Sequence, residues 1–367
     1  MKFVVSTVNP VTETEKPLRR GSDARPVLDD AAVRKVDRSG LVEHLKSLPD
    51  QVPRGLQLGT SVGPLAVNRR VVVVGMGGSG IAGAVLGAWL TAEKGAALAA
   101  IHDSRLPPWV GESDLVVAVS YSGNTLETLA ATREAMARGC DLVGIASGGT
   151  LRDLCNGHGL PYVAVPPGLM PRSAFGYLFG GLAGLFDPTV GTEVRNAVSA
   201  LKKRGEKLVP RVPDAKNPAK VLARWLKART PIIYGTPTYA PVARRWAAEL
   251  NENAKVLAWA SVLPEADHNE LVGWAEDPAA KKFAAILLRD PSESDTDKAM
   301  MNATRDLVRR SDVEEVKTDG PTLLARMLTT IQLGDWTSFY VAILRKVDPT
   351  PVAVIGKLKE RLARGEP

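Results

Sequence analysis

Short runs of apolar, strand-forming residues alternate along the chain with segments whose apolar residues recur at helical spacing. In the N-terminal half the strand runs lie at 71–74, 115–119, 142–146 and 162–165. Helical spacing occupies 81–90 and 125–137, between these runs. Such alternation is typical of βαβ units, which form a parallel sheet with helices on both faces. We therefore expect a doubly wound α/β domain here.

The same alternation returns after the polar, basic stretch 202–217, which we interpret as a linker. Strand runs lie at 231–235, 283–288 and 313–316, and helical patterns at 218–228, 239–253, 294–310, 321–345 and 352–364. These patterns predict a second doubly wound parallel-sheet α/β domain. We place an N-terminal extension at 1–35, the first domain at 36–205 and the second domain at 206–367.

The uncharged run from Val71 to Ala92 is long enough by count to cross a bilayer. Its six glycines favour another structure, because they begin directly after four valines. That order predicts a buried strand, a tight turn and a helix. Residues 1–35 alternate charged, proline and polar residues without an apolar core, so we expect no secretory signal.

The composition is that of a globular protein able to bury two cores, with 367 residues of which 45% are hydrophobic. Lys and Arg exceed Asp and Glu by seven (47 − 40). This surplus favours small anionic substrates over nucleic acid, because the basic residues are scattered and cluster only near the C-terminus. Cys140 and Cys155 have neither metal-ligand spacing nor the number needed for a disulfide framework. We therefore expect a reducing cytoplasm.

A glycine-rich segment, GlyMetGlyGlySerGly at 75–80, follows the first strand and opens a helix. Its glycines permit a tight turn and let backbone N–H groups approach an anion at the helix N-terminus. Two alternatives stay open, a purely structural turn and a dinucleotide site. The dinucleotide alternative lacks an acidic residue placed cleanly at the end of the second strand, near 100–103.

A second segment, SerTyrSerGlyAsnThr at 120–125, follows the strand at 115–119 and precedes a helix. Its three hydroxyls surround a glycine at a helix N-terminus, an arrangement that can hold a phosphate without a lysine. An ordinary helix cap needs only one such residue, so it explains the segment poorly. With Ser79, these hydroxyls are expected to meet at the carboxyl ends of neighbouring strands.

Candidate chemistry also lies further along the chain. Arg172, at the head of an apolar helix, can direct its guanidinium to a substrate oxyanion or lie on the surface. Glu252 and His268 stand in a region rich in carboxylates and amides and form a candidate acid/base pair if the fold brings them together. Glu252 ends the helix after the strand at 231–235, where we expect the crevice of the second sheet to open.

These segments, in this order, resemble the sugar-isomerase (SIS) domain family, and within it the bifunctional phosphoglucose/phosphomannose isomerases. The resemblance covers about residues 36–367. Its carriers are GlyMetGlyGlySerGly, SerTyrSerGlyAsnThr, ProArgSerAlaPheGlyTyr, AsnGluAsnAlaLys, ProGluAlaAspHisAsnGlu and AspProThrProVal. It implies two flavodoxin-like SIS domains and an aldose–ketose isomerase that acts on glucose 6-phosphate and mannose 6-phosphate through an enediol, with no metal or nucleotide cofactor.

The resemblance also implies roles for individual residues. The substrate is expected to be bound by Gly78, Ser79, Ser120, Ser122, Thr125 and the small residue Thr350. Glu252 is implied as the base that moves the proton, Arg172 as the group that stabilises the enediolate, and His268 as a ring-opening group reaching in from the partner of a homodimer. A C-terminal lysine, Lys357 or Lys359, is implied to assist ring opening.

The chain departs from the family pattern at two places, the long N-terminal extension and Asp267, where the family usually has Asn. An alternative from another class is a non-catalytic sugar-phosphate sensor. A sensor does not need Glu252 and His268 together, and no helix-turn-helix pattern precedes the first domain.

Overall fold

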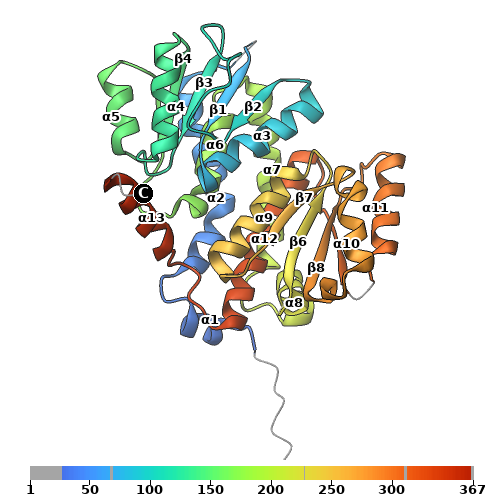
Figure 1. The fold of residues 1–367 in the computed structure, drawn as a ribbon. Helices are drawn as coiled ribbons and strands as arrows, with labels where there is room; N and C mark the ends of the chain where they lie inside the picture. The colour runs from blue at the N-terminus through green and yellow to red at the C-terminus, as the bar shows by residue number, and fades with distance from the viewer. Residues whose placement is uncertain (1–26, 67–68, 227, 310–311, 365–367) are drawn as a thin grey trace, which may run out of the picture.

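The computed structural model describes residues 27–66, 69–226, 228–309 and 312–364. Two parallel sheets, each in its own α/β domain, lie one above the other (Figure 1). The first has the order β2 (Leu98–Ile101), β1 (Val71–Val74), β3 (Leu115–Val119), β4 (Asp141–Ala146), β5 (Tyr162–Ala164). The second has the order β7 (Trp259–Val262), β6 (Thr230–Gly235), β8 (Phe283–Arg289), β9 (Val313–Lys317). Every pairing in both sheets is parallel, which confirms the predicted fold class.

No bounds were predicted for β2, since a second strand was placed only near 100–103, and β7 was missed. Their sequences, LeuAlaAlaIle and TrpAlaSerVal, are short and contain alanine, which has little preference for strands. Each is an outer strand and is paired on one side only. These two edge strands therefore escaped a prediction that depended on β-branched runs, whereas the edge strands β5 and β9 were predicted at 162–165 and 313–316.

The helices of the first domain surround its sheet. They are α2 (Leu41–Val62), α3 (Gly77–Lys94), α4 (Leu126–Ala137), α5 (Gly149–Gly157), α6 (Phe175–Ala183) and α7 (Pro188–Glu206). The uncharged run at 71–92 is strand β1 followed by α3, and Gly77 makes the turn with a φ of +51°. None of the helices within the described ranges is long and apolar enough to span a membrane.

The remaining helices belong to the second domain and to the two ends of the described chain. They are α1 (Asp30–Val36), α8 (Pro218–Leu226), α9 (Ala240–Ala254), α10 (Glu270–Glu276), α11 (Asp295–Leu307), α12 (Leu323–Arg345) and α13 (Ala353–Arg364), with 3-10 turns η1 (Pro171–Ala174), η2 (Asp214–Lys216), η3 (Glu265–His268) and η4 (Pro278–Lys282). Helix α1 begins inside the segment 1–35 that we expected to be an extension, and residues 1–26 lie outside the described residues.

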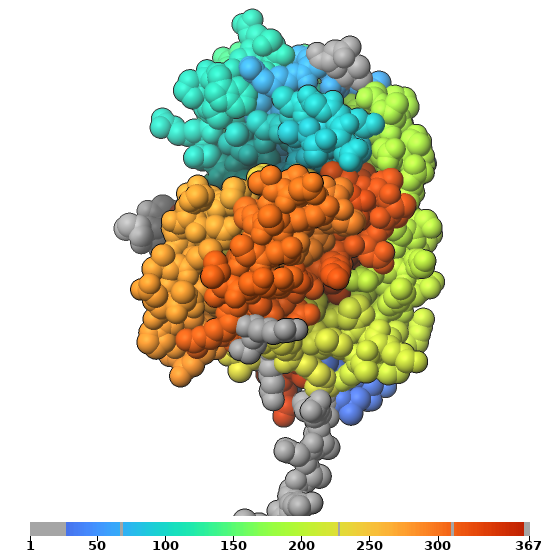
Figure 2. All heavy atoms as spheres, turned by 90° about the vertical axis from the view of Figure 1, so that its right-hand side faces the viewer, coloured from blue at the N-terminus to red at the C-terminus, as the bar shows by residue number. Residues whose placement is uncertain are grey.

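Helices α2, α6 and α12 join the two domains into one body. Helix α12 is buried along almost its whole length and packs on α7, α8 and α9. Helices α2 and α6 approach so closely that a Cβ atom at Gly55 or Gly59 would collide with the α6 backbone. One continuous hydrophobic cluster includes residues of both domains, and the space-filling view in Figure 2 shows the two domains in close contact. The turn η1, directly before α6, is therefore held firmly between them.

Candidate active site

The hydroxyls predicted to bind phosphate meet at the carboxyl ends of the neighbouring strands β1 and β3. The Tyr121 N–H donates to Ser79 Oγ over 3.0 Å, and Ser120 Oγ lies 2.9 Å from Thr125 Oγ1. Ser79 and Ser120 are buried. The structure thus brings three of the predicted hydroxyls into one group, which we call the hydroxyl cradle (Ser79, Ser120 and Thr125).

The hydroxyl of Thr125 does not cap the helix that it precedes. Thr125 is the N-cap residue of α4, yet its side chain accepts no hydrogen bond from the first turn. It faces Ser120 instead, so the ordinary-cap interpretation is wrong. Ser122 is exposed at the rim, where its Oγ accepts a 3.3 Å hydrogen bond from the Asn124 N–H. The cradle therefore combines hydroxyl donors with the positive end of the α4 dipole.

Gly78 places this cradle directly against η1. A Cβ atom at Gly78 would lie 2.8 Å from both the N and Cα atoms of Arg172, so only glycine permits this approach. Tyr121 makes a second connection to the segment before η1. Its hydroxyl donates to the Pro166 carbonyl (2.9 Å) and accepts from the Leu169 N–H (2.8 Å). The segment that leads into η1 is thereby fixed to the loop after β3.

Arg172 is buried, with 3% of its surface exposed, so the surface-residue interpretation is wrong. Its Nε donates to Asn253 Oδ1 (2.8 Å), and its Nη1 lies 3.2 Å from Glu252 Oε2. Its Nη2 donates to the carbonyls of Pro349 (3.0 Å) and Thr350 (2.8 Å). One guanidinium thus joins η1, the end of α9 and the loop before α13.

Glu252 lies in the last turn of α9, with 27% of its side chain exposed. Our expectation that this helix end lies at the crevice of the second sheet was wrong. Helix α9 begins after the carboxyl end of β6 and packs back along β6 and β7. Its last turn therefore lies at the amino ends of these strands, facing the first domain's η1 rather than its own sheet's crevice.

Two residues just after Glu252 were not predicted to belong to the site. They are Asn253 and Lys255. Asn253 is fully buried and accepts from Arg172. Lys255 has a left-handed φ of +55°, and its Nζ donates to the Glu252 carbonyl and, over 3.1 Å, to the Pro349 carbonyl. Burial, and then the nearby Arg172 charge, lower the pKa of Lys255. Their only signal in the sequence was membership of the AsnGluAsnAlaLys segment.

Thr350 lies in the loop held by Arg172. Its N–H donates to Asp348 Oδ1 over 3.1 Å, which fixes the turn. Its Oγ1 is buried and has no hydrogen-bond partner among the described residues. A buried hydroxyl without a partner is costly, so this oxygen is well suited to meet a polar group of a ligand.

Three predicted residues have no hydrogen bond or ion pair with this centre within the described part of the chain. His268 is exposed in η3, which follows the carboxyl end of β7, whereas Glu252 lies at the opposite end of the sheet. Helix α9, which runs from one end of this sheet to the other, has 15 residues, or about 22 Å at 1.5 Å per residue. Lys357 and Lys359 are exposed on α13. Asp267, the departure from the family pattern, accepts a 2.8 Å hydrogen bond from Thr304 Oγ1.

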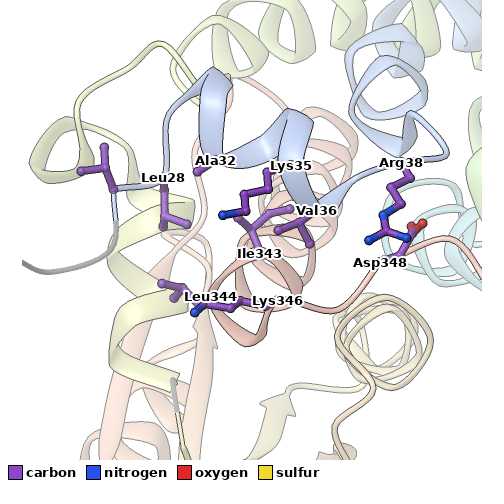
Figure 3. A pocket seen from close by; sticks show the side chains of 10 residues that line it. Leu28, Ala32, Lys35, Val36, Arg38, Ile343, Leu344, Lys346 and Asp348 are labelled. Atoms are coloured by element: carbon purple, nitrogen blue, oxygen red, sulfur yellow. The ribbon is translucent and has the colours of Figure 1, made fainter.

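A separate hollow of about 480 Å³ lies between α1 and the C-terminal end of α12 (Figure 3). Leu28, Val36 and Ile343 contribute apolar surface to it, and basic side chains, including Lys35 and Lys346, line it as well. None of the predicted site residues lines this hollow. The candidate active site is therefore the group around Arg172 and not the hollow shown in Figure 3.

Comparison with known proteins shows which family the chain is similar to. Residues 65–151 match the SIS domain, and residues 215–362 match the bacterial phospho-glucose isomerase C-terminal SIS domain. A bifunctional phosphoglucose/phosphomannose isomerase from Caldicellulosiruptor bescii is 36% identical over 88% of this chain and 99% of its own. One from Aquifex aeolicus is 34% identical over 80% of this chain and 90% of its own.

A solved structure, of a glucose-6-phosphate isomerase like protein from Thermus thermophilus, has the same fold. It superposes with a TM-score of 0.63 at 23% identity, over 91% of this chain and 99% of that one. The resemblance predicted from the sequence motifs is confirmed: the chain belongs to the SIS-domain family of bifunctional phosphoglucose/phosphomannose isomerases.

Proposed function

We propose that this protein interconverts glucose 6-phosphate, and also mannose 6-phosphate, with fructose 6-phosphate. The observation that carries the proposal is the contact between the half-buried carboxylate of Glu252 and the buried guanidinium of Arg172, 3.2 Å apart and next to the hydroxyl cradle. The names of the relatives from Caldicellulosiruptor bescii and Aquifex aeolicus support both substrates.

The hydroxyl cradle binds the phosphate group of the substrate. A serine or threonine hydroxyl has one hydrogen to donate, and Ser79 uses its oxygen only to accept from Tyr121. The N–H groups at the starts of α3 and α4 add further donors, and neither helix has a side-chain cap there. Gly78 and the exposed Ser122 complete this binding surface.

Glu252 transfers the proton between C1 and C2. Starting from the open-chain aldose, its carboxylate takes the proton from C2, the electron pair forms the C1–C2 double bond, and the carbonyl oxygen becomes an enediolate oxygen. The intermediate moves one proton from the C2 hydroxyl to the C1 oxygen, and Glu252 returns its proton to C1, which leaves the ketose. Proton return to either face of C2 in the reverse direction connects the glucose and mannose epimers.

Arg172 stabilises the enediolate. Its Nε and both N–H groups of Nη2 are engaged by Asn253, Pro349 and Thr350. Nη1 uses one N–H for Glu252, and its second N–H has no partner within the described part of the chain. A guanidinium fixed on all other sides is a preorganised donor for negative charge that develops beside the base. The unpartnered Thr350 Oγ1 can contact a substrate hydroxyl.

Ring opening requires His268, and we propose that a second copy of the chain supplies it. Within one chain His268 and Glu252 lie at opposite ends of the second domain. Helix α13, which carries Lys357 and Lys359, presents an apolar stripe of Val354, Leu358 and Leu362 with exposures of 75%, 56% and 48%. Such a stripe favours a self-complementary homodimer contact.

We place this isomerase in the cytoplasm, within the sugar-phosphate metabolism of glycolysis and gluconeogenesis. Cys140 and Cys155 are both free and buried, as is usual for proteins that fold in a reducing compartment. The sensor alternative explains the cradle but not the pairing of Glu252 with Arg172, because phosphate binding alone does not require a carboxylate in the site.

We predict that phosphate recognition depends on the hydroxyl cradle. Replacing Ser120 and Thr125 together by Ala should weaken substrate binding by about 2–4 kcal/mol, at one to two per hydrogen bond to a charged group. Titration calorimetry with fructose 6-phosphate measures this change. Ser61→Ala, which removes an exposed hydroxyl from α2, is the matched control and should bind like the parent. Unchanged affinity in the double variant would remove the cradle from the site.

Glu252→Gln is the direct test of the proposed function. It keeps shape and hydrogen bonding but removes the basic oxygen, so turnover should fall at least about 100-fold while substrate affinity stays close to that of the parent. A coupled assay with fructose 6-phosphate, followed for glucose and mannose 6-phosphates, measures turnover. Solvent deuterium should enter C1 of fructose 6-phosphate with the parent only.

The control for this test is Glu206→Gln, which changes an exposed glutamate at the end of α7 and should leave turnover unaltered. Near-parent isomerisation and deuterium exchange by Glu252→Gln would show that the base lies elsewhere. A parent protein that produces neither sugar phosphate would contradict the proposed function itself.

Mixing inactive subunits tests the shared site. After subunit exchange, Glu252→Gln and His268→Ala chains should recover about a quarter of parent activity, because half of the dimers are mixed and one of their two sites is intact. Mixing Glu252→Gln with Arg172→Lys should recover nothing, since both changes lie in the same chain's site. No recovery in the first mixture, with exchange verified by mass spectrometry, would place all groups within one chain.

A further inference from the structure

Glu249, one helical turn before Glu252, is a buried carboxylate that the proposed mechanism does not use. Only 4% of its surface is exposed. Its Oε2 accepts a 2.8 Å hydrogen bond from Asn253 Nδ2, and the Oδ1 atom of the same amide accepts from Arg172 Nε over 2.8 Å. A single amide group therefore connects Glu249 to the guanidinium beside the proposed base.

The orientation of the Asn253 amide follows from its neighbours. Ser338 Oγ donates its hydrogen to the Asp335 carbonyl (2.7 Å), so it can only accept the 2.9 Å hydrogen bond from Asn253 Nδ2. Glu249, on the same side, also accepts from Nδ2. The amide nitrogen is thus held between two acceptors, and the amide oxygen must face Arg172.

Glu249 has no cation of its own. Arg245, four residues earlier on α9, donates two hydrogen bonds to Asp335, of 3.0 and 2.8 Å, and a third to the Arg172 carbonyl. Its remaining nitrogen, Nη1, lies 3.3 Å from Glu249 Oε1. One guanidinium cannot compensate two buried carboxylates fully, and Asp335 has the better geometry. Glu249 is the carboxyl group left with the weaker contact.

The surroundings of Glu249 favour its neutral form. Burial is the largest cause, and together with the charges of Asp335 and Glu252 it raises the pKa of Glu249 to about 8 against the attraction of Arg245 and Arg172. The other titratable group nearby is His44 of α2, which lines the same small cavity as Arg172, Arg245, Glu249 and Asp335.

We propose that Glu249 is a positioning residue of the isomerase centre: in its neutral form it fixes Asn253, and through it the Arg172 guanidinium, beside Glu252, and its ionisation weakens the support that Arg172 gives to the enediolate. This inference rests on the proposed function. Ionisation of Glu249 should lower turnover because it adds a negative charge near Arg172. When Glu249 loses its proton, a new negative charge lies one amide away from Arg172 and competes with the enediolate for it.

Two substitutions separate geometry from charge. Glu249→Gln keeps an acceptor for Asn253 and cannot ionise, so turnover near pH 7 should stay within about threefold of the parent and should lose the parent's decline above about pH 8. Glu249→Leu removes the acceptor, so kcat should fall about 10- to 100-fold at every pH while KM changes less than about threefold, because the reacting groups are misplaced and the cradle is not.

The experiment measures kcat and KM from pH 6 to 10 for the parent and both variants. Glu293→Gln is the matched control, because Glu293 is also buried and also pairs with an arginine four residues away, Arg289, but lies outside the site. It should keep the parent's profile. Parent-like turnover in Glu249→Leu, or an unchanged alkaline decline in Glu249→Gln, would overturn the proposal.

A measurement without substrate distinguishes failure of this inference from failure of the proposed function. Difference infrared spectra of the parent between pH 6 and 10 should show a protonated carboxyl band that disappears on titration and is missing in Glu249→Gln. Presence of the same band in Glu249→Gln would overturn the proposal even if the parent isomerises normally. A parent that shows the band but does not isomerise would instead overturn the proposed function, and the positioning role with it.

Discussion

A buried guanidinium needs partners for its charge and for its N–H groups, and Arg172 finds them in two distant parts of the chain. It donates to Asn253 and contacts Glu252 at the end of α9, and it donates to the carbonyls of Pro349 and Thr350 before α13. Removing one partner from a buried pair costs about 3–5 kcal/mol. The folded arrangement of these segments is therefore coupled to the geometry of the site.

Packing supplies the rigidity that this arrangement needs. Gly78 allows α3 to contact the backbone of Arg172, and glycines of α2 and α6 bring those helices into backbone contact on its other side. The Arg245 guanidinium lies 4.5 Å from the Phe175 ring and donates to the Arg172 carbonyl. Arg172 is thus fixed through its backbone as well as its side chain, which is the condition for a preorganised electrostatic site.

The alternating strands and helices, the hydroxyl cradle and the family could all be predicted from the sequence, because each depends on local patterns. The ends of α9 were predicted within one residue, at 239–253 against Ala240–Ala254. The direction of α9 relative to the first domain was not predicted. Glu252 was therefore expected at the carboxyl ends of the strands of its sheet, whereas it lies at their amino ends. Asn253 and Lys255 act through contacts with residues about eighty or more positions away, and no local pattern announces such contacts. The distance between Glu252 and His268 likewise depends on the tertiary fold.

The catalytic geometry depends on Arg172, and the substitution Arg172→Lys tests this dependence. Lysine keeps the positive charge, but all its N–H donors are on one nitrogen. It therefore cannot reach Asn253, Glu252 and the two carbonyls together. We predict that turnover of fructose 6-phosphate falls at least about 100-fold while its affinity changes less than about threefold. A folded Arg172→Lys protein that isomerises at the parent rate would contradict the account.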